Sequence, residues 1–323
     1  MKRPGSDLGE GRFASLTLQA LTCNEVNMRE ISKFSESTIA TGGGGASLLD
    51  IDSALFAANF NQRPFLIGHR LCDHPLFALS SLMDLAKRLP EKDIEYNSGN
   101  LPMSVDPKQT PRNGLSIEET IRRIEECKSW MVMKYVENDP VYRDMLHECL
   151  AEVKPHSEKI VPGMTLAQGF IFITSPNSVT PYHMDPEHNF LLQVRGSKTV
   201  REFDRCVVSA EEMERFYDGA HRNLVYKDEY LAKSWTFDLQ PGFGLHFPHT
   251  FPHWVQNGPA VSISFSITFR TPDLERISMI HNANGWLRRR GITPASIGAS
   301  PWRDEIKHQA ARVVRRVRRI FGA

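Results

Sequence analysis

The second half of the chain carries a regular succession of short apolar segments separated by turns rich in glycine and proline. After His156 these segments span residues 166–174, 179–184, 188–195, 198–203, 234–239, 243–248, 253–256 and 260–269. Residues 261–269 alternate between large apolar and small polar side chains, the period of a strand with two different faces. Many short strands at this spacing predict a mainly β protein built as a sandwich or jelly roll. We place this core at residues 158–272.

The part before the core has helical spacing. Residues 77–88 repeat apolar side chains with a helical period, and Ser116 with Glu119 forms a capping-box pattern that predicts a helix through about Cys127. Asp139 followed by Pro140 predicts the start of another helix. We therefore expect a mostly helical region over 47–157 that packs on the core.

The N-terminal 46 residues have no sustained periodicity. They are polar and end in a run of four glycines, Gly42–Gly45. No Lys-Ser or Lys-Thr pair follows that run, so it predicts a linker and not a phosphate-binding loop. We expect residues 1–46 to form a flexible segment.

The C-terminal region, residues 273–323, is basic. The whole chain has a formal net charge of +1, yet ten Lys and Arg stand against Asp304 and Glu305 between Arg288 and Ala323. That stretch therefore carries +8 and the remainder −7. Residues 302–321 have the spacing of an amphipathic helix, with one apolar face. That face comprises Ile306, Ala310, Val313, Val314, Val317, Ile320 and Phe321.

This basic helix has several open interpretations. It packs on its own domain, it pairs with a second copy in a homodimer, or it binds an anionic partner such as a membrane surface or nucleic acid. If the partner is rich in phosphates, the affinity of the helix for it should fall steeply as the salt concentration rises.

Composition favours an intracellular, cytoplasmic protein. Hydrophobic residues make up 41% of the chain, enough for a full core. The five cysteines are scattered, odd in number and without a CxxC pair, which is typical of a reducing compartment. We find no apolar run long enough for a transmembrane helix and no signal peptide.

The most informative motif is His183-Met184-Asp185. Residues i and i+2 of a strand point to the same face, so His183 and Asp185 can reach one metal ion together. A second histidine would complete the 2-His-1-carboxylate set that binds Fe(II) and leaves positions open. His246, His249 and His253 compete for that distal place, and we favour His253, which begins a strand-like segment. An HxD pair alone is common by chance.

Lys198 gives the motif a more specific meaning. It begins the segment that follows the HxD region, where its ammonium can pair with the far carboxylate of 2-oxoglutarate. The first arginine after His253 is Arg270, too far along the chain for this role. Taken alone, Lys198 is better explained as a solvated lysine at a strand end.

With these residues in hand, residues 160–270 resemble a JmjC-type, cupin-like Fe(II)/2-oxoglutarate-dependent oxygenase, a family that includes the asparaginyl hydroxylase of hypoxia-inducible factor. The resemblance is carried by Thr180 three residues before His183, Asn189 six residues after it and Lys198 fifteen residues after it, with His253 following Phe251-Pro252. Two positions depart from the pattern. Phe243 stands where the family has Asp after Pro-Gly, and Ser266 stands where the family has a later Asn.

The resemblance implies a double-stranded β-helix with flanking helices. It implies that His183, Asp185 and His253 hold Fe(II), and that O2 and 2-oxoglutarate complete the reaction. Lys198, helped by Thr180 or Tyr182, would bind the C5 carboxylate, with Asn189 and Ser266 near the cosubstrate. Related hydroxylases dimerise through C-terminal helices, which favours a homodimer.

The substrate stays open between a protein or peptide side chain and a small molecule, and the outcome between hydroxylation and demethylation. A non-catalytic cupin-like binding protein is the first alternative function. A cupin metalloenzyme that does not use 2-oxoglutarate is the second.

Overall fold

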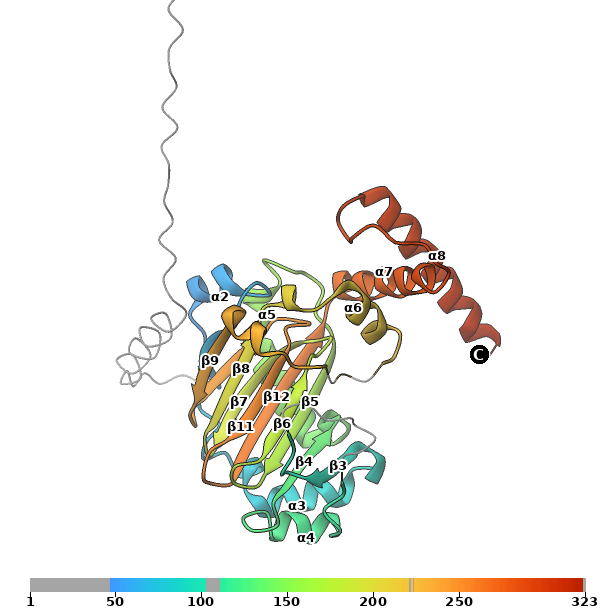
Figure 1. Ribbon diagram of the computed structural model, residues 1–323. Helices are drawn as coiled ribbons and strands as arrows, with labels where there is room; N and C mark the ends of the chain where they lie inside the picture. The colour runs from blue at the N-terminus through green and yellow to red at the C-terminus, as the bar shows by residue number, and fades with distance from the viewer. Residues whose placement is uncertain (1–46, 103–110, 221, 223, 322–323) are drawn as a thin grey trace, which may run out of the picture.

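The computed structural model describes residues 47–102, 111–220, 222 and 224–321 (Figure 1). The expected flexible segment at residues 1–46, with its glycine run, lies outside the described residues. In the described part no helix is long and apolar enough to cross a lipid bilayer.

Eight consecutive strands build the core. They are β5 (Thr165–Thr174), β6 (Val179–His183), β7 (His188–Arg195), β8 (Lys198–Phe203), β9 (Ser234–Leu239), β10 (Phe243–Phe247), β11 (His253–Asn257) and β12 (Ser262–Arg270). The order β10-β7-β12-β5 lies in a large sheet, and β6-β11-β8-β9 forms a second, four-stranded sheet. All neighbours pair antiparallel, so the chain crosses between the sheets as in a jelly roll. The predicted double-stranded β-helix is confirmed.

The region before the core contributes four strands to the large sheet as well as its helices. Strands β2 (Phe65–His69) and β1 (Leu49–Asp50) extend the large sheet beyond β10, and β4 (Ser129–Lys134) and β3 (Ile94–Ser98) extend it beyond β5. An apolar run such as that of β4 is too short for its spacing to separate strand from buried helix.

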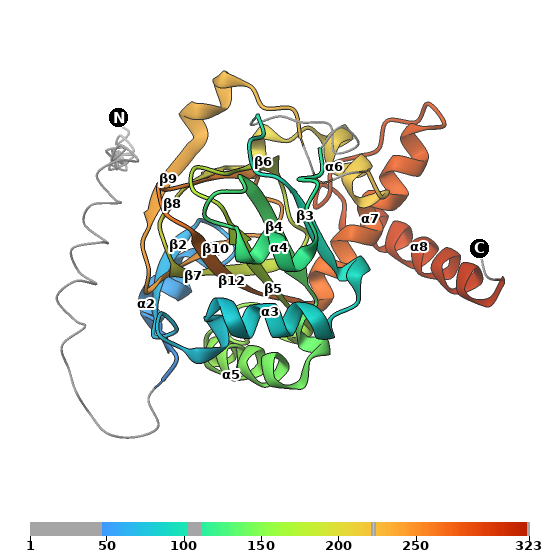
Figure 2. The same ribbon diagram turned by 90° about the horizontal axis from the view of Figure 1, so that it is seen from below.

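The described residues of this region form four helices: α2 (Ser53–Asn59), α3 (Leu79–Arg88), α4 (Ile117–Arg122) and α5 (Pro140–Ser157). Helices α3 and α5 cover one face of the large sheet, and α4 contacts α3 (Figure 2). The capping box of Ser116 and Glu119 is present at α4, and Asp139 caps α5. Strand β7 is buried on both faces, because helices cover one side and the small sheet covers the other.

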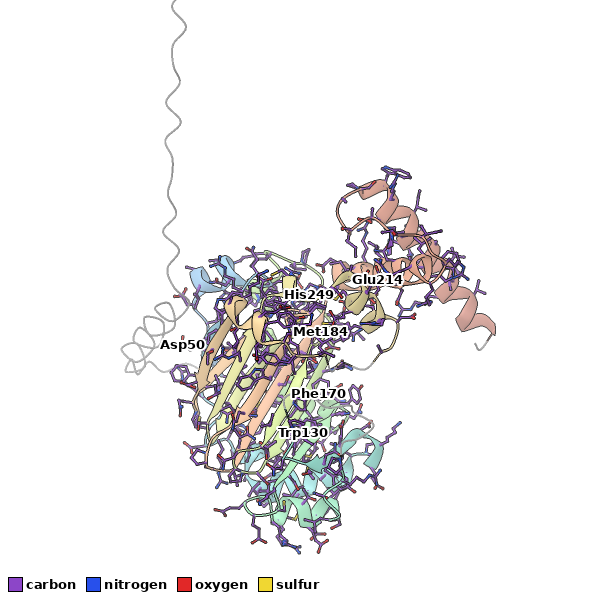
Figure 3. All side chains as sticks on the ribbon, in the orientation of Figure 1. Asp50, Trp130, Phe170, Met184, Glu214 and His249 are labelled. Atoms are coloured by element: carbon purple, nitrogen blue, oxygen red, sulfur yellow. The ribbon has the colours of Figure 1, made fainter. Side chains whose placement is uncertain are left out.

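The C-terminal helices sit beside the core. Helix α7 (Pro272–Arg288) follows β12 directly and contacts both α6 (Ala210–Tyr217) and α8 (Pro301–Phe321). Glu214 of α6 lies next to α7 and accepts two hydrogen bonds from Arg288 (Figure 3). Helix α8 extends away from the sheets (Figure 1).

Helix α8 presents its apolar residues to solvent. Ile306 is 59% exposed and Val313 62%, and Val314 and Val317 are also exposed. The side turned inward is polar and includes the buried Asp304 beside Lys307. The described part of this apolar face therefore does not pack on its own domain.

Candidate metal centre and cosubstrate pocket

Three predicted metal ligands meet at one end of the small sheet. His183 ends β6, His253 begins β11, and the two residues face each other in the antiparallel pair. Asp185 follows two residues after His183, and its Oδ2 lies 3.9 Å from Nε2 of His183 and 3.7 Å from Nε2 of His253. The ligand atoms of the three residues all lie within 4.8 Å of one another. The arrangement has the donor set and spacing of a 2-His-1-carboxylate site.

Backbone carbonyls orient both imidazoles. Nδ1 of His183 lies 2.7 Å from the carbonyl oxygen of Pro181, and Nδ1 of His253 lies 3.1 Å from that of Phe251. A carbonyl can only accept, so each Nδ1 carries the proton and donates it, which leaves Nε2 with a free lone pair. Burial is the largest of the effects that lower the pKa of His253 to about 3. His253 is therefore a neutral imidazole, the form that binds a metal.

Asp185 is the anionic member of the triad. Burial by itself raises the pKa of its carboxyl, but the positive surroundings, which include the charge and the hydrogen bond of Arg222, outweigh burial and lower that pKa to about 2. The carboxylate is thus ionised at neutral pH. Its Oδ1 accepts a hydrogen bond of 2.8 Å from Nη1 of Arg222, while Oδ2 faces the imidazoles.

Lys198 lines the same cavity as the triad. It is the first residue of β8, between Asn257 of β11 and Leu239 of β9, and only 5% of its surface is exposed. No carboxylate of the described residues forms an ion pair with its ammonium, which lies 5.7 Å from the centre of the Phe172 ring. Burial lowers the pKa of Lys198 to about 7. A buried cation without a protein anion is costly, so the cavity favours an anionic ligand.

Three of the other predicted cosubstrate residues also line this cavity of about 530 Å³. Thr180 Oγ1 accepts a hydrogen bond of 3.0 Å from the indole nitrogen of Trp130. Ser266 donates one of 2.6 Å to Oδ1 of Asn189. Ser266, which stands where the family has Asn, thus forms a hydrogen-bonded pair with Asn189 at the cavity wall.

Tyr182, the alternative to Thr180, does not reach the cavity. Its ring packs 5.2 Å from that of Phe203 and 5.6 Å from that of Tyr226, among residues that do not line the cavity. A β-bulge explains the difference. On β11 the partners of His183 and Thr180 are two residues apart, so β6 holds one extra residue between them. Without the bulge, residues three apart on a strand would point to opposite faces. The bulge turns the side chain of Thr180 to the same face as His183.

The two rejected histidines lie in a separate cluster. His246 stacks 4.9 Å from Phe60, and its ring lies 6.5 Å from that of His188. His249 hydrogen-bonds Asn61. Neither histidine lines the cavity, so the structure brings only His253 to His183 and Asp185.

Sequence reasoning missed several residues that line the cavity. Trp130 comes from β4 and Phe170 from β5 (Figure 3). Tyr135, directly after β4, and Phe172 of β5 also line the cavity. Arg222 lies in an insert that carried no motif, and only its contact with Asp185 identifies it.

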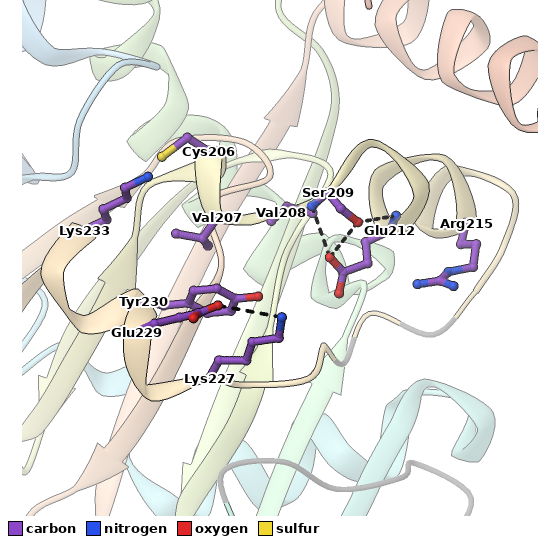
Figure 4. Close-up of a pocket in the computed structure, with 10 residues that line it drawn as sticks. All are labelled: Cys206, Val207, Val208, Ser209, Glu212, Arg215, Lys227, Glu229, Tyr230 and Lys233. Carbon is purple, nitrogen blue, oxygen red and sulfur yellow. Dashed lines mark hydrogen bonds and ion pairs between the residues drawn. The ribbon is translucent and has the colours of Figure 1, made fainter. Parts of the chain in front are cut away.

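A larger hollow of about 660 Å³ lies elsewhere, between α6 and the turn at Asp228–Lys233 (Figure 4). Its charged groups are used locally: Glu212 caps α6 through Ser209, and Lys227 pairs with Glu229 at 3.7 Å. It contains none of the triad residues, so size alone does not identify the site.

Glu202 is a buried carboxyl beside the metal centre and opposite His253 in the sheet. It is fully buried, neither of its oxygens has a hydrogen-bond partner in the described part, and burial raises its pKa well above the usual value. The folded state therefore holds this proton above pH 4.5, and stability is lost as pH rises.

We expect Glu202→Gln to raise the melting temperature more at pH 8 than at pH 5. Exposed Glu148→Gln is the control; an equal gain at both pH values would contradict the expectation.

The chain matches the family profile described as the JmjC domain over residues 144–277, from α5 into α7. No curated protein matches it. Among solved structures, the X-ray structure of E. coli ycfD is 17% identical, with a TM-score of 0.49, over 82% of this chain and 67% of that one. The E. coli ribosomal oxygenase YcfD with cobalt and 2-oxoglutarate is 15% identical, with a TM-score of 0.46, over 82% and 66%. This chain thus spans about two thirds of their length, and a likeness this distant carries no argument.

Proposed function

We infer the function of this chain from one premise: it is a JmjC-type Fe(II)/2-oxoglutarate-dependent oxygenase, with its JmjC domain at residues 144–277. We propose that His183, Asp185 and His253 hold the iron. Lys198 and Thr180 bind the C5 carboxylate of 2-oxoglutarate, and Asn189 with Ser266 contacts the cosubstrate from the large sheet.

One observation carries this assignment. A triad with the donor set of an Fe(II) site and a buried lysine without a carboxylate partner line a single cavity. The triad alone is compatible with a cupin metalloenzyme that uses only O2. The lysine adds a site for a second, anionic group, which matches a cosubstrate with carboxylates at both ends.

When bound, Fe(II), O2 and 2-oxoglutarate supply the oxidation, which couples decarboxylation to succinate with insertion of oxygen into a substrate C–H bond. The protein contributes position and protection. The carbonyls of Pro181 and Phe251 hold the imidazoles in their metal-binding tautomer. The ring of Phe172 lies 5.7 Å from the ammonium of Lys198 and forms an apolar neighbour of it.

We propose that the substrate is a protein side chain. The cavity continues beyond the cosubstrate residues to a rim formed by Asn97 of β3, Lys134 of β4, Tyr135 and the connection around Gly219. We assign these residues, which lie outside the cosubstrate set, to contacts with the substrate. Hydroxylation is the proposed outcome, and oxidation of an N-methyl carbon would lead to demethylation.

Succinate formation tests the activity. We expect the purified protein with Fe(II), ascorbate, O2 and 2-oxoglutarate to release succinate even without substrate, and Asp185→Ala to abolish this release. Exposed Asp84→Ala is the matched control and should behave as the wild type. Binding of 2-oxoglutarate without turnover would favour the non-catalytic binding protein. If the metal-loaded protein neither binds 2-oxoglutarate nor forms succinate, the proposed function is wrong.

We also propose that α8 forms a homodimer contact. The exposed apolar residues Ile306, Val313 and Val317 support this, because an uncovered apolar helix face gains stability when buried. We expect Val313→Asp with Val317→Asp to give a monomer in light scattering, whereas exposed Gln309→Asp leaves the dimer intact. A monomeric wild-type protein would contradict the dimer, and binding to anionic vesicles would then favour the anionic partner.

A reducing, cytoplasmic location completes the proposal. Cys72, Cys127, Cys149 and Cys206 are all free thiols, as expected where disulfides do not form.

A further inference from the structure

The two oxygens of the Asp185 carboxylate have different surroundings. Oδ2 faces Nε2 of His183 and of His253, at 3.9 and 3.7 Å. Oδ1 points away from them and accepts a hydrogen bond of 2.8 Å from Nη1 of Arg222. One oxygen is thus available to a metal, and the other is already bound to a guanidinium.

We propose that Arg222 is a positioning residue for the metal centre: it holds the outer oxygen of Asp185, so that the carboxylate offers the metal a single oxygen. The inference rests on the proposed function, in which the triad binds Fe(II). A carboxylate that swings round to offer both oxygens would take one more position at the metal, and the cosubstrate and O2 need those positions.

The backbone around Arg222 fixes it beside the metal-binding strand. The carbonyl of Arg222 accepts a hydrogen bond of 3.3 Å from the amide of Met184, and the amide of Leu224 donates one of 3.0 Å to the carbonyl of Tyr182. Strand β6 is the edge of the small sheet, so residues 222 and 224 bind the edge that carries the HxD motif. These backbone hydrogen bonds therefore hold Arg222 next to Asp185.

Glu187 holds the guanidinium from the other side. It is only 3% exposed, and its Oε1 lies 3.9 Å from Nη2 of Arg222 and 2.6 Å from Nη2 of Arg270. Carboxylates and guanidiniums thus alternate along a row in the order Asp185, Arg222, Glu187 and Arg270. Arg270 contacts Glu187 in this row and makes no contact with Asp185 in the described part, so it provides a matched control.

The test is metal binding, measured without turnover. We expect wild-type protein to bind Co(II) in calorimetry, and Arg222→Gln to bind it about 10–100-fold more weakly, the usual loss when the partner of a metal ligand is removed. Arg222→Lys should retain part of the affinity, because an ammonium can still donate to Oδ1. Arg270→Gln should bind Co(II) as the wild type does. All four proteins are compared far below their melting temperatures, so that folding does not limit binding.

A spectroscopic readout separates positioning from general destabilisation. The visible absorption of bound Co(II) reports coordination, and we expect it to change in Arg222→Gln and not in Arg270→Gln. Added guanidinium ion at low concentration should restore part of the affinity of an Arg222→Ala variant.

Each outcome is decisive. Wild-type affinity and spectrum in Arg222→Gln would overturn the inference, as would an equal loss in Arg270→Gln, which would place the effect in Glu187. A rise in the Kd of 2-oxoglutarate with unchanged Co(II) binding would make Arg222 a cosubstrate ligand and also overturn it. Failure of the wild-type protein to bind Co(II) would count against the proposed function itself.

Discussion

Replacement of Lys198 by methionine is expected to raise the Kd of 2-oxoglutarate by two to three orders of magnitude in the metal-loaded protein. The substitution keeps most of the side chain's volume but removes the only buried cation found beside the triad in the described residues. Loss of one member of a buried charge pair costs about 3–5 kcal/mol. Calorimetry with Mn(II)-loaded protein measures the change, and exposed Lys87→Met is the control.

The pH dependence of the same equilibrium gives a second, independent check. The pKa of Lys198 is about 7 in the free protein, because its surroundings are desolvated. A bound carboxylate stabilises the charged ammonium, so binding takes up a proton above pH 7. Between pH 7 and 9 the Kd of 2-oxoglutarate should rise about tenfold per pH unit. A Kd that stays constant over this range, or that Lys198→Met leaves unchanged, would remove Lys198 from the site.

Unfolding in mild acid is the second large expected effect. His188 is buried between Phe60 and Phe269, neither ring nitrogen has a hydrogen-bond partner among the described residues, and burial lowers its pKa to about 4. Burial likewise lowers the pKa of His69 to about 4 and that of His249 to about 3. The folded protein keeps these imidazoles neutral, whereas the unfolded chain takes up protons below pH 6.5. Stability is therefore present above pH 6.5 and lost as pH falls towards 4.

The size of this loss follows from the pKa values. One pKa unit corresponds to about 1.4 kcal/mol, so protonation of the unfolded chain at His69 and His188 costs the fold about 3 kcal/mol each. We expect the melting temperature to fall steeply between pH 6.5 and 4. His188→Phe keeps the aromatic packing, removes the titration and should shift unfolding to lower pH. His147→Phe, at an exposed position, is the control; a variant His188→Phe that unfolds at the wild-type pH would contradict this explanation.

The strands of the core could be predicted closely from the chain. All eight strands from β5 to β12 lie within two residues of the expected ends, because alternation of large apolar with small polar side chains is a local property. The same local order places His183 and Asp185 on one strand end. Spacing then identified His253 and Lys198 as candidates, and the structure brings both to one cavity.

Three features depended on contacts between distant segments. The bulge in β6 selects Thr180 over Tyr182, and a bulge is a matter of register with β11, which no pattern within β6 shows. Strand β4 pairs with β5 and β3 pairs with β4, and both strands contribute residues to the cavity wall. Helix α8 turns its polar side inward and leaves its apolar face exposed, a choice among interpretations that the amphipathic pattern left open.

The sequence by itself determined where the core strands begin and end and that His183 and Asp185 lie together, since both depend on neighbours a few residues apart. The tertiary structure alone decided which partner each polar group has. Asp185 binds Arg222, Lys198 forms no ion pair with a carboxylate of the described residues, and Glu202 has no hydrogen-bond partner in the described part. Arg222 stands 37 residues after Asp185, and the lack of a partner at Lys198 and Glu202 depends on every segment packed around them. Only the folded chain shows such contacts and their absence.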